Sequence, residues 1–282
     1  RAAVRPGEDA GGKLRRQSPF EAHAGAVPAN VTLYSWYGFL LRECIRPYQA
    51  ALCREPRVES IQFVEGRTNN RAPRSQISRH YLAGDRMYSD RASDFAVRCD
   101  ELTHGQVISR LADMYDEVYV DEVQDLAGYD LDLIERLLKS PIGVTLVGDT
   151  RQATYATNYA PRYSQFRGPN LATLFQLWES HGLCQIDHRL TSLRCVQALC
   201  DLADALYPQM PRTHSGNDQL TGHDGIYLVA PEHVTAYMQE FAPAVLRHDR
   251  RQACDGLPAM NFGQSKGRTY SRVLIFPNGP LT

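Results

Sequence analysis

Apolar residues recur along this chain with two spacings, one typical of short buried strands and one of amphipathic helices. Apolar runs at 117–121 and 144–149 each end in an acid and predict strands. Between them lies an apolar face at helical spacing, made of Leu131, Ile134, Leu137 and Leu138. A strand, a helix and a strand within about 30 residues form a βαβ unit, which predicts a parallel sheet and hence an α/β fold.

The same patterns predict further elements on both sides of this unit. Residues 31–49 begin as a β-prone run and become helical at 37–45, and residues 94–115 contain a helix. Later helices are expected at 171–182 and at 191–207, the second with Thr191 or Ser192 as its N-cap. Short apolar runs predict strands at 183–190, 224–231 and 271–277.

These elements group into two α/β units that divide near residue 160. Residues 31–157 form the first unit, and the polar, Arg-rich stretch at about 54–93 interrupts it as a surface insertion. Residues 158–282 form the second unit, beginning with a polar linker. Residues 1–30 are rich in Gly, Ala, Pro and charge without apolar periodicity, so we expect a loop or a disordered segment there.

Composition narrows the class of protein only a little. The 282 residues are 43% hydrophobic, which is ordinary for a folded domain. The net charge of −1 shows no overall excess of basic residues for binding nucleic acid, although a neutral protein can still carry a local basic groove. The seven cysteines are odd in number and lack a CxxC pair, which favours reduced thiols and a cytoplasmic setting. The spacing of Cys184, His188, Cys195 and Cys200 fits no common zinc pattern. No run long enough for a membrane span and no signal peptide is visible.

Two predicted strands end in acids, at Asp121-Glu122 and at Asp149. In parallel α/β sheets, ligands bind at the carboxyl ends of the strands. There, one carboxylate can hold the magnesium of a nucleoside triphosphate, and a second can deprotonate the attacking water. The alternative is that these acids only cap the helices that follow.

The wider context of these acids resembles the UvrD/Rep-type superfamily 1 DNA helicases. That family writes its motif II as DExQD and its motif III as GDxxQxxY. Motif II is matched by Asp121, Glu122, Gln124 and Asp125, and motif III by Gly148, Asp149, Gln152 and Tyr155.

The resemblance assigns a role to each matched residue. It implies that Asp121 ligates magnesium, that Glu122 is the general base, and that Gln124 and Asp149 belong to the nucleotide site. Gln152 is then expected to contact the γ-phosphate and to couple it to DNA. Tyr155 is expected on the DNA side of that coupling region, with a packed core aromatic as the alternative. Thr157 stands where the family often has a base-stacking Trp.

Three further segments resemble family motifs less closely. "VTLYSWYGFLL", from residue 31, stands where the family has its T-x-H-x-F segment, so Trp36 is a candidate DNA contact, with buried packing as the alternative. "DHRLTS" resembles motif IV, which implies Arg189 at the γ-phosphate and His188 at the adenine, or a surface ion pair for Arg189. "NFGQSKGRTYSRVLIFP" resembles motif V and implies nucleotide contacts at Lys266 and Gly267 and a DNA contact at Ser265.

An intact phosphate-binding loop is not found. The nearest match is "GEDAGGKL", in which Gly7, Gly12 and Lys13 have the spacing of GxxxxGK[ST], but Leu14 replaces the Ser or Thr. We also expect no apolar strand before it. We therefore interpret the chain, which begins at Arg1, as a helicase segment running from after motif I to motif V. Without the central strand, we expect the first domain to be incomplete and to be the less stable one.

As a whole, the resemblance implies two RecA-like parallel-sheet domains of the P-loop NTPase type, the first incomplete. It implies ATP and Mg²⁺ as cofactors and single-stranded DNA, or DNA with a single-stranded tail, as partner, with 3′–5′ movement. The intact parent would then be an ATP-hydrolysing helicase, and this segment alone inactive. Two alternatives stay open: a helicase-derived module that binds DNA or a partner without hydrolysis, and a metal-dependent nuclease.

Overall fold

A computed structural model of the chain describes residues 2–5, 28–69, 71–153, 156–219 and 221–278. The chain forms two compact units, unit 1 (Arg1–Asp187) and unit 2 (His188–Thr282). The division falls later than the expected boundary near residue 160. The reason is that α7 (Leu171–Ser180) buries Leu171, Leu174 and Trp178 in the core of unit 1.

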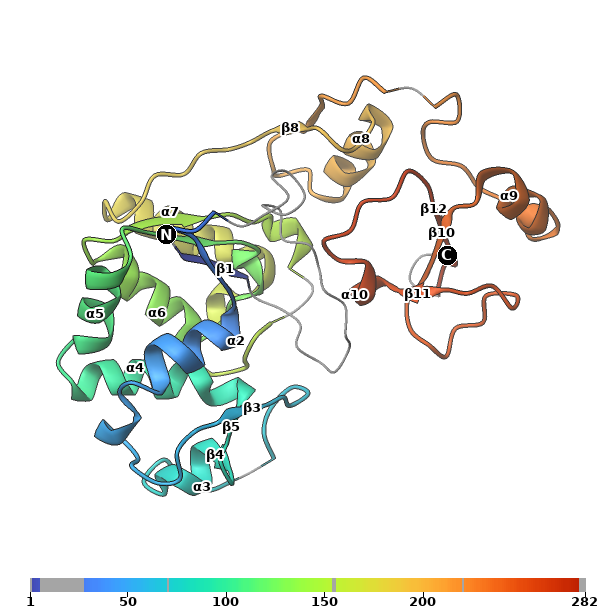
Figure 1. Cartoon of the computed structure of the whole chain (residues 1–282). Helices are drawn as coiled ribbons and strands as arrows, with labels where there is room; N and C mark the ends of the chain where they lie inside the picture. Colours follow the sequence, from blue (N-terminus) through green and yellow to red (C-terminus); the bar gives the residue numbers. More distant parts are fainter. Residues whose placement is uncertain (1, 6–27, 70, 154–155, 220, 279–282) are drawn as a thin grey trace. The chain divides into compact units, whose positions relative to one another are not determined.

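Unit 1 is built on a four-stranded sheet whose neighbouring strands are all parallel (Figure 1). The strands are β1 (Ala2–Arg5), β2 (Thr32–Ser35), β6 (Glu117–Val120) and β7 (Gly143–Leu146), in the order β2-β1-β6-β7. Both strands of the predicted βαβ unit form, and α6 (Tyr129–Leu138) connects them. The predicted parallel sheet is therefore confirmed.

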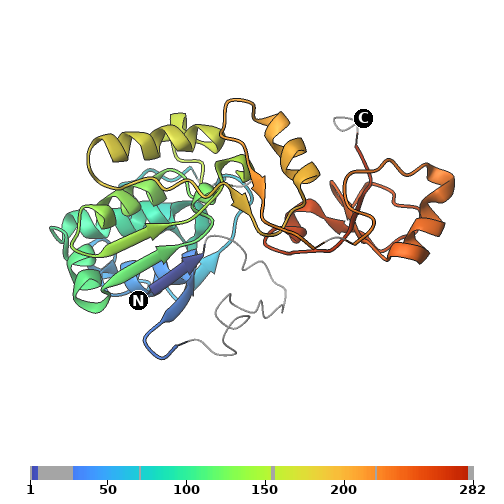
Figure 2. The ribbon, with the colours of Figure 1, turned by 90° about the horizontal axis from the view of Figure 1, so that it is seen from above.

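The structure differs from the expectation that residues 1–30 form a loop. Ala2–Arg5 make the strand β1, which pairs with β2 on one side and with β6 on the other. Figure 2 shows this strand, in dark blue, within the sheet. Its apolar run is only Ala2-Ala3-Val4 between two arginines, and its pairing partners lie far away in the chain. The sheet consequently has a strand at the position that was expected to be missing.

The helices of unit 1 share one apolar core with the sheet. They include α2 (Trp36–Phe39), α4 (Ala92–Leu102) and α5 (Gln106–Met114), and α2 continues as the π-helical segment η1 (Leu40–Ile45). The strand-to-helix change predicted at 31–49 is confirmed, with Ser35 capping α2 by accepting a hydrogen bond from the backbone N–H of Gly38. Phe39, Phe95, Leu111 and Ile134 are buried together in this core.

The predicted insertion has a small sheet of its own. Its strands are β3 (Ser60–Gln62), β4 (Leu82–Ala83) and β5 (Arg86–Tyr88), in the order β3-β5-β4, with α3 (Ile77–Tyr81) before β4. Tyr81 and Met87 are buried in the core of unit 1. The polar stretch at 54–93 thus has strands and a helix of its own and packs against the core of unit 1 through Tyr81 and Met87.

Unit 2 contains a second, smaller parallel sheet in the order β11-β10-β12. Its strands are β10 (Ala244–Arg247), β11 (Met260–Asn261) and β12 (Val273–Ile275), and the last confirms the strand predicted at 271–277. A separate pair of short strands is formed by β8 (Thr191–Ser192) and β9 (His214–Ser215). The helices are α8 (Gln197–Leu206), α9 (Val234–Phe241) and α10 (Phe262–Ser265).

Three expectations for unit 2 differ from the structure. Residues 183–190 and 224–231 are not strands, and Ile226, Tyr227 and Leu228 are exposed. An apolar run becomes a strand only where a neighbouring strand accepts its backbone hydrogen bonds, and these runs have no such neighbour in the described structure. Thr191 and Ser192 form β8 and do not cap α8, whose N-cap is Val196.

The described fold is thus mixed α/β with small parallel sheets, as the pattern predicts. Every described helix is too short or too polar to cross a bilayer. All the cysteines lie in described segments, and each of them is a free thiol.

Candidate functional site

The carboxyl ends of β6 and β7 lie side by side at one edge of the unit 1 sheet. The parallel register pairs Val120 with Leu146, the last residues of the two strands. Beyond them, the backbone N–H of Val147 donates to the carbonyl of Val120 at 2.8 Å. Asp121 and Glu122 leave β6 at this edge, and Asp149 leaves β7 there. The predicted meeting of the two acidic segments is therefore confirmed.

Glu122 has an unusual backbone conformation. Its φ of 56° and ψ of 39° lie in the left-handed region, which residues other than glycine seldom adopt because the Cβ crowds the backbone. The Asp121 carboxylate accepts the Glu122 N–H at 3.0 Å and stabilises this turn. The 3₁₀ turn η4 (Val123–Asp125) begins directly afterwards. Strain of this kind is concentrated at functional sites.

The buried side chain of Gln124 connects the two acidic segments. Its Nε2 donates to the Glu122 carboxylate, and its Oε1 accepts the Asp149 N–H at 3.1 Å. Gly148 makes room for this arrangement, since a Cβ there would stand 2.3 Å from the Gln124 Oε1. The motif II and motif III residues thus form one hydrogen-bonded unit.

Asp149 in turn organises the 3₁₀ turn η5 (Thr150–Gln152). Its carboxylate accepts hydrogen bonds from the Arg151 side chain at 3.0 Å and from Gln152 Nε2 at 3.0 Å. Partial burial raises the pKa of Asp149, but the bonds from Arg151 and Gln152 outweigh it and hold that pKa below its usual value. Asp149 is therefore ionised near neutral pH, and Gln152 stands exposed beside it.

The DNA-contact predictions have different outcomes. Tyr155 lies outside the described residues. Trp36 is fully buried, and its Nε1 donates to the Asp130 carboxylate at 2.7 Å, so its ring offers no face to a base and the packing alternative holds. Thr157, at the position of the family's stacking Trp, is buried as well and donates its hydroxyl to the same carboxylate.

Sequence reasoning did not single out Asp130, the acceptor of these bonds. It is 1% exposed and lies in the first turn of α6. The sequence did indicate that Asp130 is buried, because it lies four and seven residues before Ile134 and Leu137 and hence on the apolar face of the helix. Burial raises the pKa of this carboxyl, and the hydrogen bonds from Thr157 and Trp36 oppose that rise.

The second group of predicted site residues belongs to unit 2. His188 and Arg189 are exposed, and Leu190 separates them from β8. Ser265 ends α10, where its hydroxyl donates to the Phe262 carbonyl at 2.8 Å. The half-buried Lys266 follows, and Gly267 turns the chain toward β12 with a φ of 73° that favours glycine. A basic turn thus precedes the strand β12.

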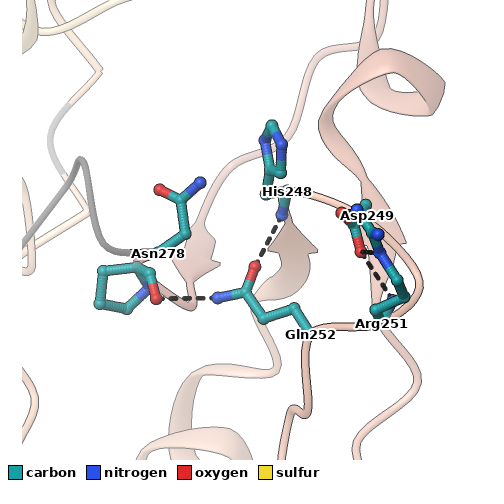
Figure 3. Close-up of a pocket in the computed structure, with 6 residues that line it drawn as sticks. His248, Asp249, Arg251, Gln252 and Asn278 are labelled. Carbon is teal, nitrogen blue, oxygen red and sulfur yellow. Dashed lines mark hydrogen bonds and ion pairs between the residues drawn. The ribbon is translucent and has the colours of Figure 1, made fainter.

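Unit 2 has a hollow at the carboxyl ends of β10 and β12 (Figure 3). Gln252 joins the two ends, because its Oε1 accepts the His248 N–H at 2.9 Å and its Nε2 donates to the Pro277 carbonyl at 2.8 Å. Asp249 and Arg251 form an ion pair at the rim. The sequence analysis did not identify these residues, because their chain segments meet only through the sheet.

The fold and the site together define an α/β protein that carries acids and amides at the carboxyl edge of a parallel sheet. The family model of the UvrD/REP helicase N-terminal domain matches residues 46–166, which include both acidic segments. The resemblance to UvrD-type helicases is therefore confirmed over residues 46–166. No curated protein matches the chain.

Proposed function

We propose that this chain is part of the core of an ATP-hydrolysing DNA helicase or translocase. The observation that carries the proposal is the linked edge of the unit 1 sheet, where Gln124 joins Glu122 to the segment of Asp149 and Gln152. The family match of residues 46–166 supports the same function. Neither a simple helix-capping role nor a nuclease site calls for an amide bridge between the two acidic segments.

In this proposal each residue has one task. Glu122 accepts the proton of the attacking water, and its left-handed backbone and the Gln124 amide fix its direction. Gln152 contacts the γ-phosphate from an exposed turn that Asp149 holds through its carboxylate. Bound magnesium would neutralise charge on the phosphates. Gln124 and Asp149 are thereby support for the reacting groups.

The residues present are compatible with a magnesium–nucleotide complex. Asp121 is a partly exposed carboxylate at the end of β6. Magnesium at nucleotide sites takes one or two protein carboxylates and completes its shell with phosphate oxygens and water. Within the described residues no group of three or more metal-ligating side chains occurs. A site built on Asp121 and the nucleotide needs no such group.

The place of β1 bears on the phosphate-binding loop. The strand lies between β2 and β6, so its carboxyl end opens at the same sheet edge as Asp121. The sequence directly after it carries Gly7, Gly12 and Lys13 at phosphate-loop spacing, with Leu14 in place of the hydroxyl residue. These four residues lie outside the described ranges.

Unit 2 would complete the enzyme as its second RecA-like domain. Arg189 is proposed to reach the γ-phosphate, His188 the adenine, and Lys266 and Gly267 the nucleotide as well. Ser265 and Tyr155 are the proposed contacts to single-stranded DNA or to a single-stranded tail. Hydrolysis would drive movement along that strand in the 3′–5′ direction. The exposure of His188 and Arg189 is compatible with these roles.

The substitution Glu122→Gln tests the proposal. In the intact parent we expect it to lower DNA-stimulated ATP hydrolysis by about 10²- to 10⁴-fold, the usual contribution of a general base, while binding of a fluorescent ATP analogue with Mg²⁺ persists. Glu117→Gln is the matched control, because it makes the same change at the opposite end of β6. Undiminished hydrolysis in Glu122→Gln would show that Glu122 is not the general base.

A further inference from the structure

Asp130 is the centre of a buried hydrogen-bond cluster. One carboxylate oxygen accepts the Trp36 Nε1 at 2.7 Å, and the other accepts Asn158 Nδ2 at 2.8 Å, the Ala127 N–H at 3.3 Å and the Thr157 hydroxyl. A buried carboxylate is costly unless its oxygens are satisfied, and here both are. The Ser93 side chain forms a further hydrogen bond to this carboxyl group, so most of the donors come from segments distant from Asp130 in sequence.

The cluster joins the segment that follows motif II to the segment that follows motif III. Ala127 follows motif II, and residues 157–158 follow the Gln152 turn by a few positions. Two more bonds join the same segments: the Thr157 N–H donates to the Asp125 carbonyl at 2.9 Å, and Asn158 Nδ2 donates to the Ala127 carbonyl. The contact is therefore built from side chains and backbone together.

Stability alone does not explain a carboxylate at this place. Asp130 is on the face of α6 that buries Ile134 and Leu137. Replacing buried charged groups by apolar residues of similar volume is often neutral or stabilising. Unlike an apolar residue, the carboxylate accepts directional hydrogen bonds from two specific partners, Thr157 and Asn158.

We propose that Asp130 is a positioning residue for the Gln152 turn. Gln124 ties the start of that turn to Glu122, and Asp130 ties the chain beyond it to the motif II loop. Catalytic groups act on one phosphate only when their relative placement is held within about half an ångström. The catalytic meaning of this second tie rests on the proposed function, but its structural effect does not.

Two substitutions of Thr157 distinguish the effect of its hydroxyl hydrogen bond from the effect of side-chain packing. Thr157→Val keeps the branched shape and removes the hydroxyl donor, whereas Thr157→Ser keeps the donor. Hydrogen exchange of the full chain is measured by mass spectrometry on peptides covering 149–153 and, for comparison, 133–138 in α6. We expect exchange at 149–153 to rise about five- to tenfold in Thr157→Val and to stay unchanged in Thr157→Ser. The reason is that the Thr157 hydroxyl both donates to Asp130 and accepts the Ala127 N–H at 3.2 Å, and valine does neither.

Two outcomes would overturn the proposal: unchanged exchange at 149–153 in Thr157→Val, or an equal rise at 133–138, which would mean a purely structural role. Asp130→Asn is the second variant and removes one acceptor oxygen from the same cluster. In the intact parent, if it hydrolyses ATP, Thr157→Val should lower kcat about tenfold with an unchanged KM for ATP. A parent without that activity would contradict the proposed function, while the exchange result on this chain still decides the structural role of Asp130.

Discussion

At the scale of single residues, the candidate site depends on close fits around Gln124. The side chain is buried, and both ends of its amide are used, one at Glu122 and one at the Asp149 N–H. Gly148 has no Cβ to obstruct this amide. The two motifs are recognisable from their letters, but the hydrogen bonds that join them are a property of the folded chain.

Gly148→Ala should therefore displace Gln124. A Cβ at 148 would stand 2.3 Å from the Gln124 Oε1 and 3.0 Å from Val123 Cγ1, so the amide must move and the Asp149 N–H loses its acceptor. We expect the free energy of unfolding in urea to fall by about 1–3 kcal/mol, as for other overpacked sites.

Gly143→Ala is the matched control for this prediction. It adds a Cβ at the other end of β7, where the nearest atom is the flexible Glu117 Cγ at 3.3 Å. A loss of stability in Gly143→Ala as large as that in Gly148→Ala would contradict the role given to Gln124.

At the scale of elements, the segment after residue 157 is attached to unit 1 through α6. Glu135 on α6 accepts hydrogen bonds from Tyr163 and from Lys139, and Trp178 of α7 adds another. Burial raises the pKa of Glu135, but these bonds outweigh it and leave the pKa below its usual value. The attachment consequently depends on the charge of one carboxylate.

This shift predicts a loss of stability in acid. Because the folded-state pKa of Glu135 is depressed, its contribution is present above the unfolded-state pKa of about 4.3 and is lost as the pH falls through the folded-state pKa. We expect Glu135→Gln to lower the free energy of unfolding by about 1 kcal/mol at pH 7. The difference from wild type should shrink toward pH 3.

Urea unfolding between pH 3 and pH 7 measures this effect, with Glu65→Gln as a control at an exposed carboxylate. A difference between wild type and Glu135→Gln that stays constant with pH would mean that the Glu135 charge does not hold the segment.

At the scale of the whole molecule, the two units differ in the size of their cores. Unit 1 buries aromatic and aliphatic side chains from its sheet, its helices and the insertion. Among the described residues of unit 2, the buried apolar side chains are Cys200, Val234, Val245, Leu246 and Cys254. Burial thus favours unit 1 as the more stable unit, the reverse of what the sequence analysis expects, because β1 is present in its sheet.

Limited proteolysis should therefore begin in unit 2. Chymotrypsin cleaves after large apolar residues, and Leu193, Tyr227 and Leu228 are all well exposed in unit 2. We expect the first cuts at these positions and a resistant fragment that contains unit 1, identified by mass spectrometry. First cuts within α4 or α6 would contradict this order of stability.

Much of the fold and part of the site could be predicted from local pattern. Apolar spacing predicts the strands β6 and β7, the helix α6 between them and the change from β2 to α2. It can do so because helices and strands each place neighbouring side chains on one face at a fixed, short spacing. The acids at the strand ends follow too, because parallel strands present their carboxyl ends at one edge.

The sequence by itself determined the α/β class, the resemblance to UvrD-type helicases and the identity of the acids and amides at the sheet edge. The tertiary structure alone decided that Ala2–Arg5 form a strand between β2 and β6, that Trp36 is buried against Asp130, and that Gln124 bridges Glu122 and Asp149. The physical reason is distance along the chain. The spacing of apolar residues reflects only the periodicity of a residue's own helix or strand. Pairing, burial and hydrogen bonding between distant segments exist only once the chain has folded.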